Sequence, residues 1–178
     1  MPNIDINFLH NLKKDYKEYS NFIETGTYRG ATILHMEQYF SKLYTVEVKP
    51  ELYEKVKNNY KGEKINFYLG DSLKILGEIL INIEGDSIIF LDGHCSNGIT
   101  GIGEKFCPLF EELDHIISNH KGEAIIIIDD FRLFGKRGWR EINIEDTLEI
   151  VKNRITEYYF LPSVYHEKDR LVIHISKM

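Results

Sequence analysis

Three aspartates follow two short apolar runs of this sequence, where carboxylates could bind a cation or orient a reacting group. Asp92 follows the run SIIFL, and Asp129 and Asp130 follow the run AIIII. If these carboxylates converge, like-charge repulsion raises a pKa unless a cation lies among them. An all-oxygen set of this kind suits Mg²⁺, Mn²⁺ or Ca²⁺ rather than a metal that prefers thiolates. The three aspartates are therefore candidate metal ligands.

The adjacency of Asp129 and Asp130 leaves two interpretations of this pair. Adjacent residues of a strand point in opposite directions, so both can face one ion only if the chain turns there. In the alternative, one of them only caps a helix or hydrogen-bonds a loop. The sequence is compatible with both.

His94 stands two residues after Asp92 and is the candidate general base. An imidazole titrates near neutral pH and could take a proton from an acceptor hydroxyl. The alternative is a solvated loop histidine. With Asp92, His94 forms the candidate catalytic pair, in which the aspartate orients the acceptor more than it reacts with it.

A glycine-containing segment, IETGTYRG, provides the candidate cofactor site. Glycines in a turn between a strand and a helix let the main chain approach a ligand closely. Glu47 ends the next apolar run about twenty residues later, where an acidic residue can accept hydrogen bonds from both ribose hydroxyls of an adenosine cofactor. An ordinary flexible turn is the alternative. The candidate binding residues in the segment are Glu24, Gly26, Thr27 and Gly30.

Asp71 and Ser72 follow the next apolar run, within LGDS, and extend the candidate cofactor site. Asp71 could face the adenine amino group, or it could only cap the helix that follows. Asp92 also belongs to this set, because ligands bind at the carboxyl ends of successive strands in open α/β sheets.

These residues require elements that bring them to one edge of a sheet. Short apolar runs alternate with longer stretches of helical period, which predicts βαβ units and a parallel sheet. The predicted helices cover 4–19, 31–40, 50–60, 72–83, 105–120 and 144–155. The predicted strands cover 21–24, 42–48, 65–69, 87–91, 123–128, 157–165 and 170–176.

The last two predicted strands are separated only by residues 166–169, too few for a helical crossover, so they should form an antiparallel hairpin. A nicotinamide-binding Rossmann domain normally continues with parallel crossovers instead. The predicted fold class is a doubly wound α/β sheet, with residues 1–20 as an N-terminal helical segment and 21–176 as a Rossmann-like core. We expect one domain over residues 1–178.

From about residue 21 to 176, the chain resembles a class I S-adenosylmethionine-dependent methyltransferase. The segment IETGTYRG matches the first motif of that family, and Glu47 matches its ribose-binding acidic residue. The resemblance implies a seven-stranded sheet of order 3-2-1-4-5-7-6. The aspartates after the fourth and fifth strands resemble those of the metal-dependent O-methyltransferases of the catechol and macrolide-sugar kinds, in which such residues bind the ion.

The expected function is therefore transfer of a methyl group from S-adenosylmethionine to a hydroxyl of a small acceptor, with Mg²⁺ or another divalent cation. Two alternatives remain: a nicotinamide-dependent oxidoreductase, and a non-catalytic interaction protein that keeps the fold. Arg132, Lys136, Arg137 and Arg140 could grip an anionic acceptor, or they could form a solvated basic loop.

The composition of the chain limits the classes of binding partner and the cellular locations that we expect for the protein. The net charge of −6 opposes the phosphate backbone of nucleic acid, so a small-molecule substrate is expected. No apolar segment approaches the length of a membrane span, and the first residues do not read as a secretory signal, so we expect a cytoplasmic protein. Two cysteines are too few for a disulfide framework. Because little of the chain remains to build an acceptor pocket, a homodimer that completes the pocket is one interpretation.

Overall fold

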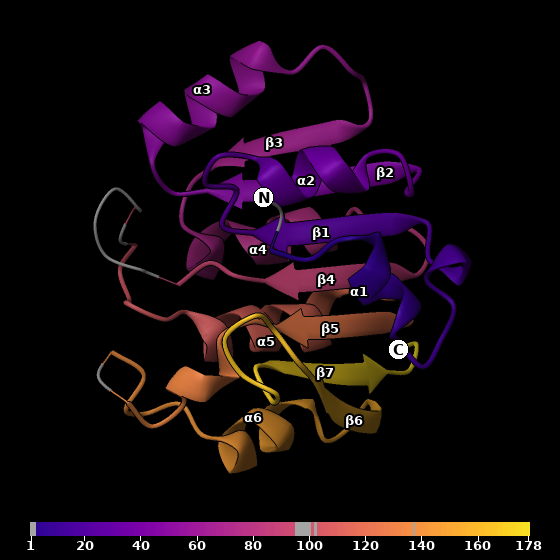
Figure 1. The fold of residues 1–178 in the computed structure, drawn as a ribbon, viewed down its shortest axis with the longest axis vertical. Helices are drawn as coiled ribbons and strands as arrows, with labels where there is room; N and C mark the ends of the chain where they lie inside the picture. The colour runs from indigo at the N-terminus through magenta and orange to yellow at the C-terminus, as the bar shows by residue number, and fades with distance from the viewer. Residues whose placement is uncertain (1–2, 95–100, 102, 137) are drawn as a thin grey trace.

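A seven-stranded sheet with the order β3-β2-β1-β4-β5-β7-β6 forms the centre of the molecule (Figure 1). The computed structural model describes residues 3–94, 101, 103–136 and 138–178. The strands are β1 (Asn21–Thr25), β2 (Lys42–Glu47), β3 (Ile65–Leu69), β4 (Ser87–Leu91), β5 (Ala124–Ile128), β6 (Ile155–Leu161) and β7 (Arg170–Ile175). The first five strands pair in parallel, whereas β7 is antiparallel to both β5 and β6. The predicted fold class, strand order and antiparallel hairpin are confirmed.

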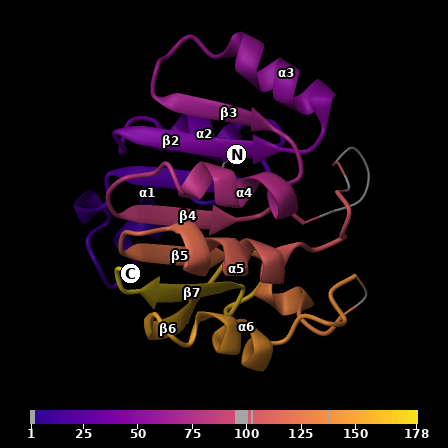
Figure 2. The same cartoon turned by 180° about the vertical axis from the view of Figure 1, so that it is seen from behind.

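Helices cover both faces of the sheet (Figures 1 and 2). On one face, α1 and α2 pack with Phe22 and Ile88; on the other, α4, α5 and α6 pack with Ile23 and Ile89. This division follows from the alternation of side chains along each strand. The helices are α1 (Ile6–His10), α2 (Ala31–Met36), α3 (Pro50–Asn59), α4 (Ser72–Leu80), α5 (Leu109–Asn119) and α6 (Ile144–Val151), with 3₁₀ turns η1 (Tyr16–Glu18) and η2 (Phe131–Leu133).

The N-terminal segment is not the single helix that the apolar spacing predicted over residues 4–19. Asp5 caps α1 by accepting a hydrogen bond from the Phe8 amide, and Asp15 caps η1 in the same way, so the segment is two short pieces. The apolar side chains on which the helix was predicted are nevertheless all buried: Ile4, Phe8, Leu9, Leu12, Tyr16 and Tyr19. The spacing therefore identified the buried face but not the local conformation.

The boundary between the last helix and the strand after it also differs from the prediction. The helix predicted over 144–155 ends at Val151, and β6 begins at Ile155. Arg154 explains the early end, because its guanidinium donates to the carbonyl groups of His120, Gly122 and Ser176 and draws the chain away from the helix axis. The predicted strand over 157–165 ends at Leu161, before Pro162, which cannot donate to a strand ladder.

The other predicted helices are also shorter in the structure. Those predicted over 31–40 and 72–83 end at Met36 and Leu80, and the one predicted over 50–60 ends at Asn59. The helix predicted over 105–120 begins only at Leu109, after Pro108. No helix in the described part of the chain is long and apolar enough to cross a membrane.

Candidate functional site

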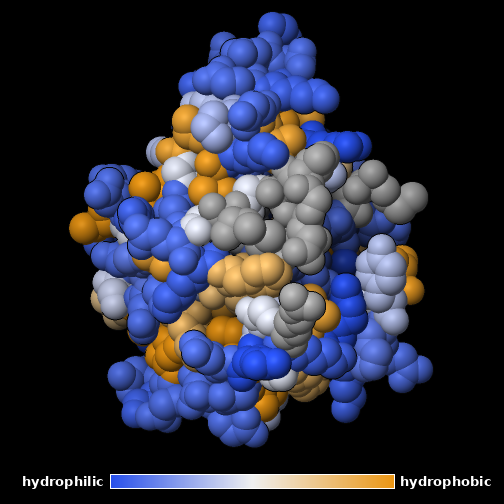
Figure 3. Space-filling view, turned by 90° about the vertical axis from the view of Figure 1, so that its left-hand side faces the viewer, coloured by the Kyte–Doolittle hydropathy of each residue, from blue (hydrophilic) through white to orange (hydrophobic). Residues whose placement is uncertain are grey.

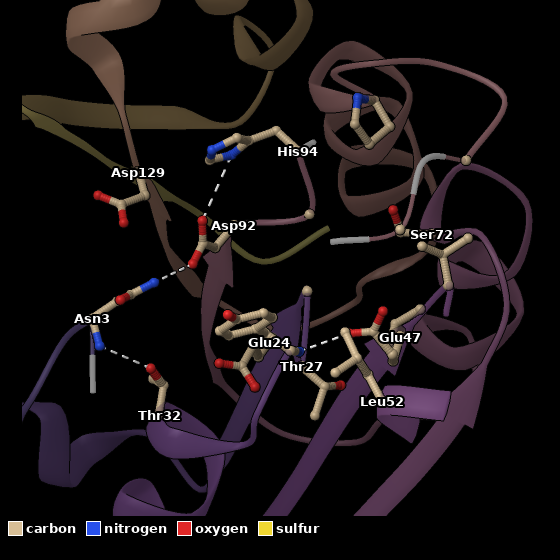
Figure 4. A pocket seen from close by; sticks show the side chains of 18 of the residues that line it. Asn3, Glu24, Thr27, Thr32, Glu47, Leu52, Ser72, Asp92, His94 and Asp129 are labelled. Atoms are coloured by element: carbon tan, nitrogen blue, oxygen red, sulfur yellow. Dashed lines mark hydrogen bonds and ion pairs between the residues drawn. The ribbon is translucent and has the colours of Figure 1, made fainter. Parts of the chain in front are cut away.

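A cavity of about 560 Å³ opens at the carboxyl ends of the parallel strands. Figure 3 looks onto this end of the sheet, where hydrophilic surface predominates and smaller hydrophobic areas lie between. Nearly all the candidate residues line this one cavity: Glu24, Gly26, Thr27, Glu47, Asp71, Ser72, Asp92, His94, Asp129 and Asp130. The sheet therefore brings the candidate cofactor and acceptor residues together, as Figure 4 shows for many of them.

Gly26 allows the ends of β1 and β4 to approach each other. Its φ is +85°, and a Cβ atom built on it would lie 2.4 Å from the carbonyl oxygen of Asp92. Any side chain here would therefore push the two strand ends apart. Gly30, in contrast, does not line the cavity: a Cβ atom there would lie 2.6 Å from Cγ1 of Val56 on α3. Gly30 therefore has a packing role against α3, and its predicted contact with a cofactor stays a prediction.

Glu47 is the last residue of β2, and its carboxylate binds backbone amides in the loops that follow β1 and β2. Oε2 accepts a hydrogen bond from the Tyr28 amide at 2.7 Å, and Oε1 accepts one from the Lys49 amide at 2.9 Å. Each carboxylate oxygen can accept a further hydrogen bond. The side chain is therefore held in one orientation and keeps free acceptor capacity for hydroxyl groups.

Glu24 lies at the bottom of the cavity with neutral hydrogen-bond partners. The Thr45 hydroxyl donates to its Oε2 at 3.0 Å, and the Thr27 hydroxyl lies 2.5 Å from that of Thr45. Burial raises the pKa of Glu24 well above its ordinary value, and the charges of Asp92 and Glu47 raise it further. A positively charged ligand group beside Glu24 would favour its ionised form.

Asp71 caps α4, so the capping interpretation is confirmed. Its Oδ1 accepts a hydrogen bond from the Leu73 amide at 3.1 Å, and its Oδ2 accepts one from the Glu104 amide at 2.7 Å. Both oxygens are thus already engaged, although Asp71 and the buried Ser72 also line the cavity. A contact of Asp71 with adenine would compete with the Glu104 amide.

His94 lies between two carboxylates and packs against Trp139. Its Nε2 lies 2.8 Å from Oδ2 of Asp130, and its Nδ1 lies 3.6 Å from Oδ1 of Asp92. Burial acts to lower the pKa of His94, but the hydrogen bond to Asp130 and the nearby carboxylates raise it overall. Because Nε2 is already paired with Asp130 and Nδ1 faces Asp92, His94 is poorly placed to take a proton from an acceptor.

Asp92 is a carboxylate whose surroundings favour its protonated form. Burial and the charges of Asp129 and Asp130 raise its pKa to about 7, although His94 and a hydrogen bond from Asn3 act in the opposite direction. A group that titrates near neutral pH is suited to accept a proton during catalysis. The structure therefore favours Asp92 over His94 as the proton acceptor.

The chain turns at Asp130, as the metal hypothesis required. Asp130 has a φ of +58°, in the left-handed region, so it and Asp129 both line the cavity. Carboxylate oxygens of Asp129, Asp130 and Asp169 lie within 4.8 Å of one another, close enough for one cation. Among the described residues, this set of possible metal ligands contains Asp169 and does not contain Asp92, which the sequence had suggested as the third ligand.

Arginines already pair with these carboxylates. Arg132 forms ion pairs with Asp130 and Asp169, and Nε of Arg170 lies 3.2 Å from Oδ1 of Asp129. The oxygen donors suit a hard cation. A divalent ion would nevertheless have to displace at least one guanidinium group to reach them.

The sequence did not single out Asn3, Asp169 or Arg170, which reach the site from distant parts of the chain. Asn3 donates a hydrogen bond to Asp92, and Arg170 forms an ion pair with Asp129. No motif or spacing in the sequence marks either residue. Within the basic segment, Arg132 does line the cavity, but it faces carboxylates rather than an open anion site. Lys136 and Arg140 do not line the cavity, and Arg137 lies outside the described residues.

Comparison with known proteins supports the fold. No protein-family model and no curated protein matches the chain. The O-methyltransferase TomG from Streptomyces achromogenes, solved with S-adenosylmethionine, matches with a TM-score of 0.64 and 14% identity over 91% of this chain and 75% of that one. The N-methyltransferase NodS from Bradyrhizobium japonicum WM9 matches with a TM-score of 0.59 and 13% identity, over 89% and 86%.

An rRNA methylase from Streptococcus thermophilus also matches, with a TM-score of 0.56 and 13% identity over 90% of this chain and 88% of that one. The neighbours thus share a fold and differ in the atom that they methylate. At these identities, the comparisons establish that the chain has the fold of S-adenosylmethionine-dependent methyltransferases. They do not single out the metal-dependent O-methyltransferases.

We expect the substitution G26A to destabilise the protein more than G135A does. Both glycines have a positive φ, of +85° and +73°, but none of the described residues lies within 4 Å of a Cβ atom at Gly135. The left-handed backbone alone costs about 1–2 kcal/mol in G135A, and overpacking against Asp92 adds about 1–3 kcal/mol in G26A. Urea unfolding of the two variants measures the difference, and equal losses would contradict the close approach of β1 and β4.

Proposed function

We propose that this protein binds S-adenosylmethionine and transfers its methyl group to a small-molecule acceptor. The observation that carries the proposal is the single cavity that Gly26, Glu47 and Asp92 share at the carboxyl ends of β1, β2 and β4. Ligands bind at this place in open α/β sheets. The fold shared with TomG, which was solved with this cofactor, supports the same assignment.

Residues on β1 and β2 would hold the cofactor. Glu47 has free acceptor capacity for the two ribose hydroxyls, because its own hydrogen bonds to Tyr28 and Lys49 use only part of it. Glu24 has only neutral hydroxyl partners among the described residues, and a cationic amino group would stabilise its charge. Gly26 leaves the space that a ligand needs beside the main chain. We therefore propose that the cofactor-binding residues are Glu24, Gly26, Thr27, Glu47, Asp71, Ser72 and Asp92.

When bound, S-adenosylmethionine supplies a methyl group on a positively charged sulfur. Asp92 would orient the acceptor and take up the proton that the acceptor loses, because its pKa lies near neutrality. His94, paired with Asp130, would place positive charge near Asp92 and favour its ionised form. Alignment of the reacting groups can contribute about 7–11 kcal/mol, more than a proton acceptor typically does.

We further propose that the acceptor is a small hydroxylated molecule. The cavity wall beside Asp92 includes Asp129, Asp130 and Arg132. Arg132 pairs with Asp130, and Arg170 pairs with Asp129, so each of these two carboxylates has a guanidinium partner. A polar, uncharged acceptor that both donates and accepts hydrogen bonds fits such a wall. A divalent ion at the aspartates belongs to the same proposal, and its chemistry would be to lower the pKa of the acceptor hydroxyl.

Calorimetric titration with S-adenosylmethionine, S-adenosylhomocysteine and NAD tests the cofactor assignment. We expect both adenosyl ligands to bind and NAD not to bind. E47Q should weaken both adenosyl ligands by about tenfold, because a carboxylate acceptor is replaced by a weaker amide. E78Q, at an exposed position on α4, is the matched control and should leave binding unchanged.

Binding of NAD alone would overturn the proposal in favour of an oxidoreductase. Transfer of a labelled methyl group to a panel of hydroxylated and amino acceptors then tests catalysis. Binding without any methylated product would favour the non-catalytic alternative.

We expect D92N to reduce the preference for S-adenosylmethionine over S-adenosylhomocysteine by about tenfold. The two ligands differ by one positive charge, and only the former gains from a carboxylate. In the wild type, the preference should be larger at pH 8.5 than at pH 6, because Asp92 and His94 lose protons over this range and the site becomes more negative. Titrations with EDTA present exclude effects of metal ions. D114N, at an exposed position on α5, should behave as the wild type does.

We expect R132Q to bind Mn²⁺ about tenfold more tightly than the wild type does, because a competing charge is removed from Asp130 and Asp169. Electron paramagnetic resonance of free Mn²⁺ measures the affinity without requiring activity. R140Q, which changes an exposed arginine, is the control. If neither wild type nor R132Q retains the ion at millimolar concentration, the divalent ion is excluded from the proposal.

A further inference from the structure

We propose that Asn3 is a positioning residue of this site, because its side-chain amide holds the Asp92 carboxylate toward the cavity. The proposal rests on the proposed function, since it assigns a role in binding a charged cofactor. Asn3 lies in the N-terminal segment, before the first strand, and lines the cavity beside Asp92 and Thr32 (Figure 4).

The backbone of Asn3 is tied to two elements that do not belong to the N-terminal segment. Its amide donates to the Thr32 hydroxyl on α2 at 3.0 Å, and its carbonyl oxygen accepts a hydrogen bond from Nη2 of Arg170 at 2.5 Å. The next residue, Ile4, is buried in the core. These contacts fix the position of the main chain at Asn3 independently of its side chain.

Arg170 links this segment to the aspartates of the site. The guanidinium that binds Asn3 through Nη2 also pairs with Asp129 through Nε, and it lies over the ring of Phe8 on α1. The N-terminal segment therefore contributes Asn3 to the cavity wall, between α2 and the start of β7.

The side-chain amide of Asn3 has a different partner, Asp92. Its Nδ2 donates to Oδ2 of Asp92 across 89 residues of sequence. Among the residues that the structure describes, the other oxygen of Asp92 has only His94 as a partner, at 3.6 Å, which is too long for a strong hydrogen bond. The amide of Asn3 is therefore the main contact that sets the direction of the carboxylate.

A neutral donor suits this position better than a cation would. Asp92 is surrounded by Asp129 and Asp130, whose charges oppose its ionisation. A hydrogen bond from an amide favours the charged form and leaves the charge uncancelled. A lysine or arginine would neutralise the carboxylate and remove its attraction for a cationic ligand.

The backbone and the side chain of Asn3 have different partners, so an experiment can distinguish positioning of Asp92 from mere attachment of the N-terminal segment. In N3A, the backbone contacts to Thr32 and Arg170 can persist, and only the hydrogen bond to Asp92 is lost. We therefore expect N3A to fold, with a melting temperature only a few degrees below that of the wild type, because one hydrogen bond is lost. The preference for S-adenosylmethionine over S-adenosylhomocysteine should fall by about tenfold, because a hydrogen bond to a charged group is removed.

Calorimetric titrations of both ligands, with EDTA present, test this expectation. N3Q keeps the amide donor and should restore part of the preference. N7A is the matched control, because Asn7 lies on α1 and its amide contacts Asp5 away from the cavity. In the double variant N3A/D92N, the preference should equal that of D92N alone, since the two residues act through one contact.

A wild-type preference in N3A would overturn the proposal. Equal weakening of both ligands would also overturn it, because it would mean that Asn3 shapes the cavity rather than the charge of Asp92. If the wild-type protein binds neither ligand, the proposed function itself fails, and that result is distinct from a failure of the role of Asn3.

Discussion

The structure of the site depends on the cost of gathering carboxylates where water is largely excluded. Glu24 and Asp92 are enclosed in the cavity, and burial together with neighbouring charge raises the pKa of each. Such a group is stable only if donors or cations face it. The strands and loops around the cavity supply these donors and cations. Neutral donors reach the side of β1 and β2, and guanidinium groups reach the side of β5.

Because the carboxylates on one side have neutral donors and those on the other side have cationic partners, the cavity has two chemically different halves. Around Glu24 and Glu47, the described donors are hydroxyl and backbone amide groups, which orient a carboxylate without cancelling its charge. Around Asp129, the cations Arg132 and Arg170 lie close to the carboxylates. The first half is complementary to a ligand with positive charge, and the second to a polar ligand without net charge. That polarity is what a cationic methyl donor and a neutral acceptor require.

The sequence predicts the sheet well and the surroundings of the site only in part. Apolar runs and the short gap before Arg170 were enough for the strand order, because they depend on local periodicity and chain length. The N-terminal helix was wrong because the caps at Asp5 and Asp15 interrupt a continuous apolar stripe. The contact between Asn3 and Asp92 spans 89 residues, and no local pattern encodes it. Long-range polar contacts of this kind are fixed by the tertiary fold.

The antiparallel strand β7 connects the fold with the charge balance of the site. Leu171 pairs with Ile128, so the start of β7 and the residue before it, rather than the residues after its end, lie beside the end of β5. Asp169 and Arg170 thereby reach the carboxylates that follow β5. In a parallel strand, the opposite end, with Ser176, would lie there, and it would bring no guanidinium group. The reversal of one strand thus supplies the cation that Asp129 needs, and with it the anchor for the N-terminal segment at Asn3.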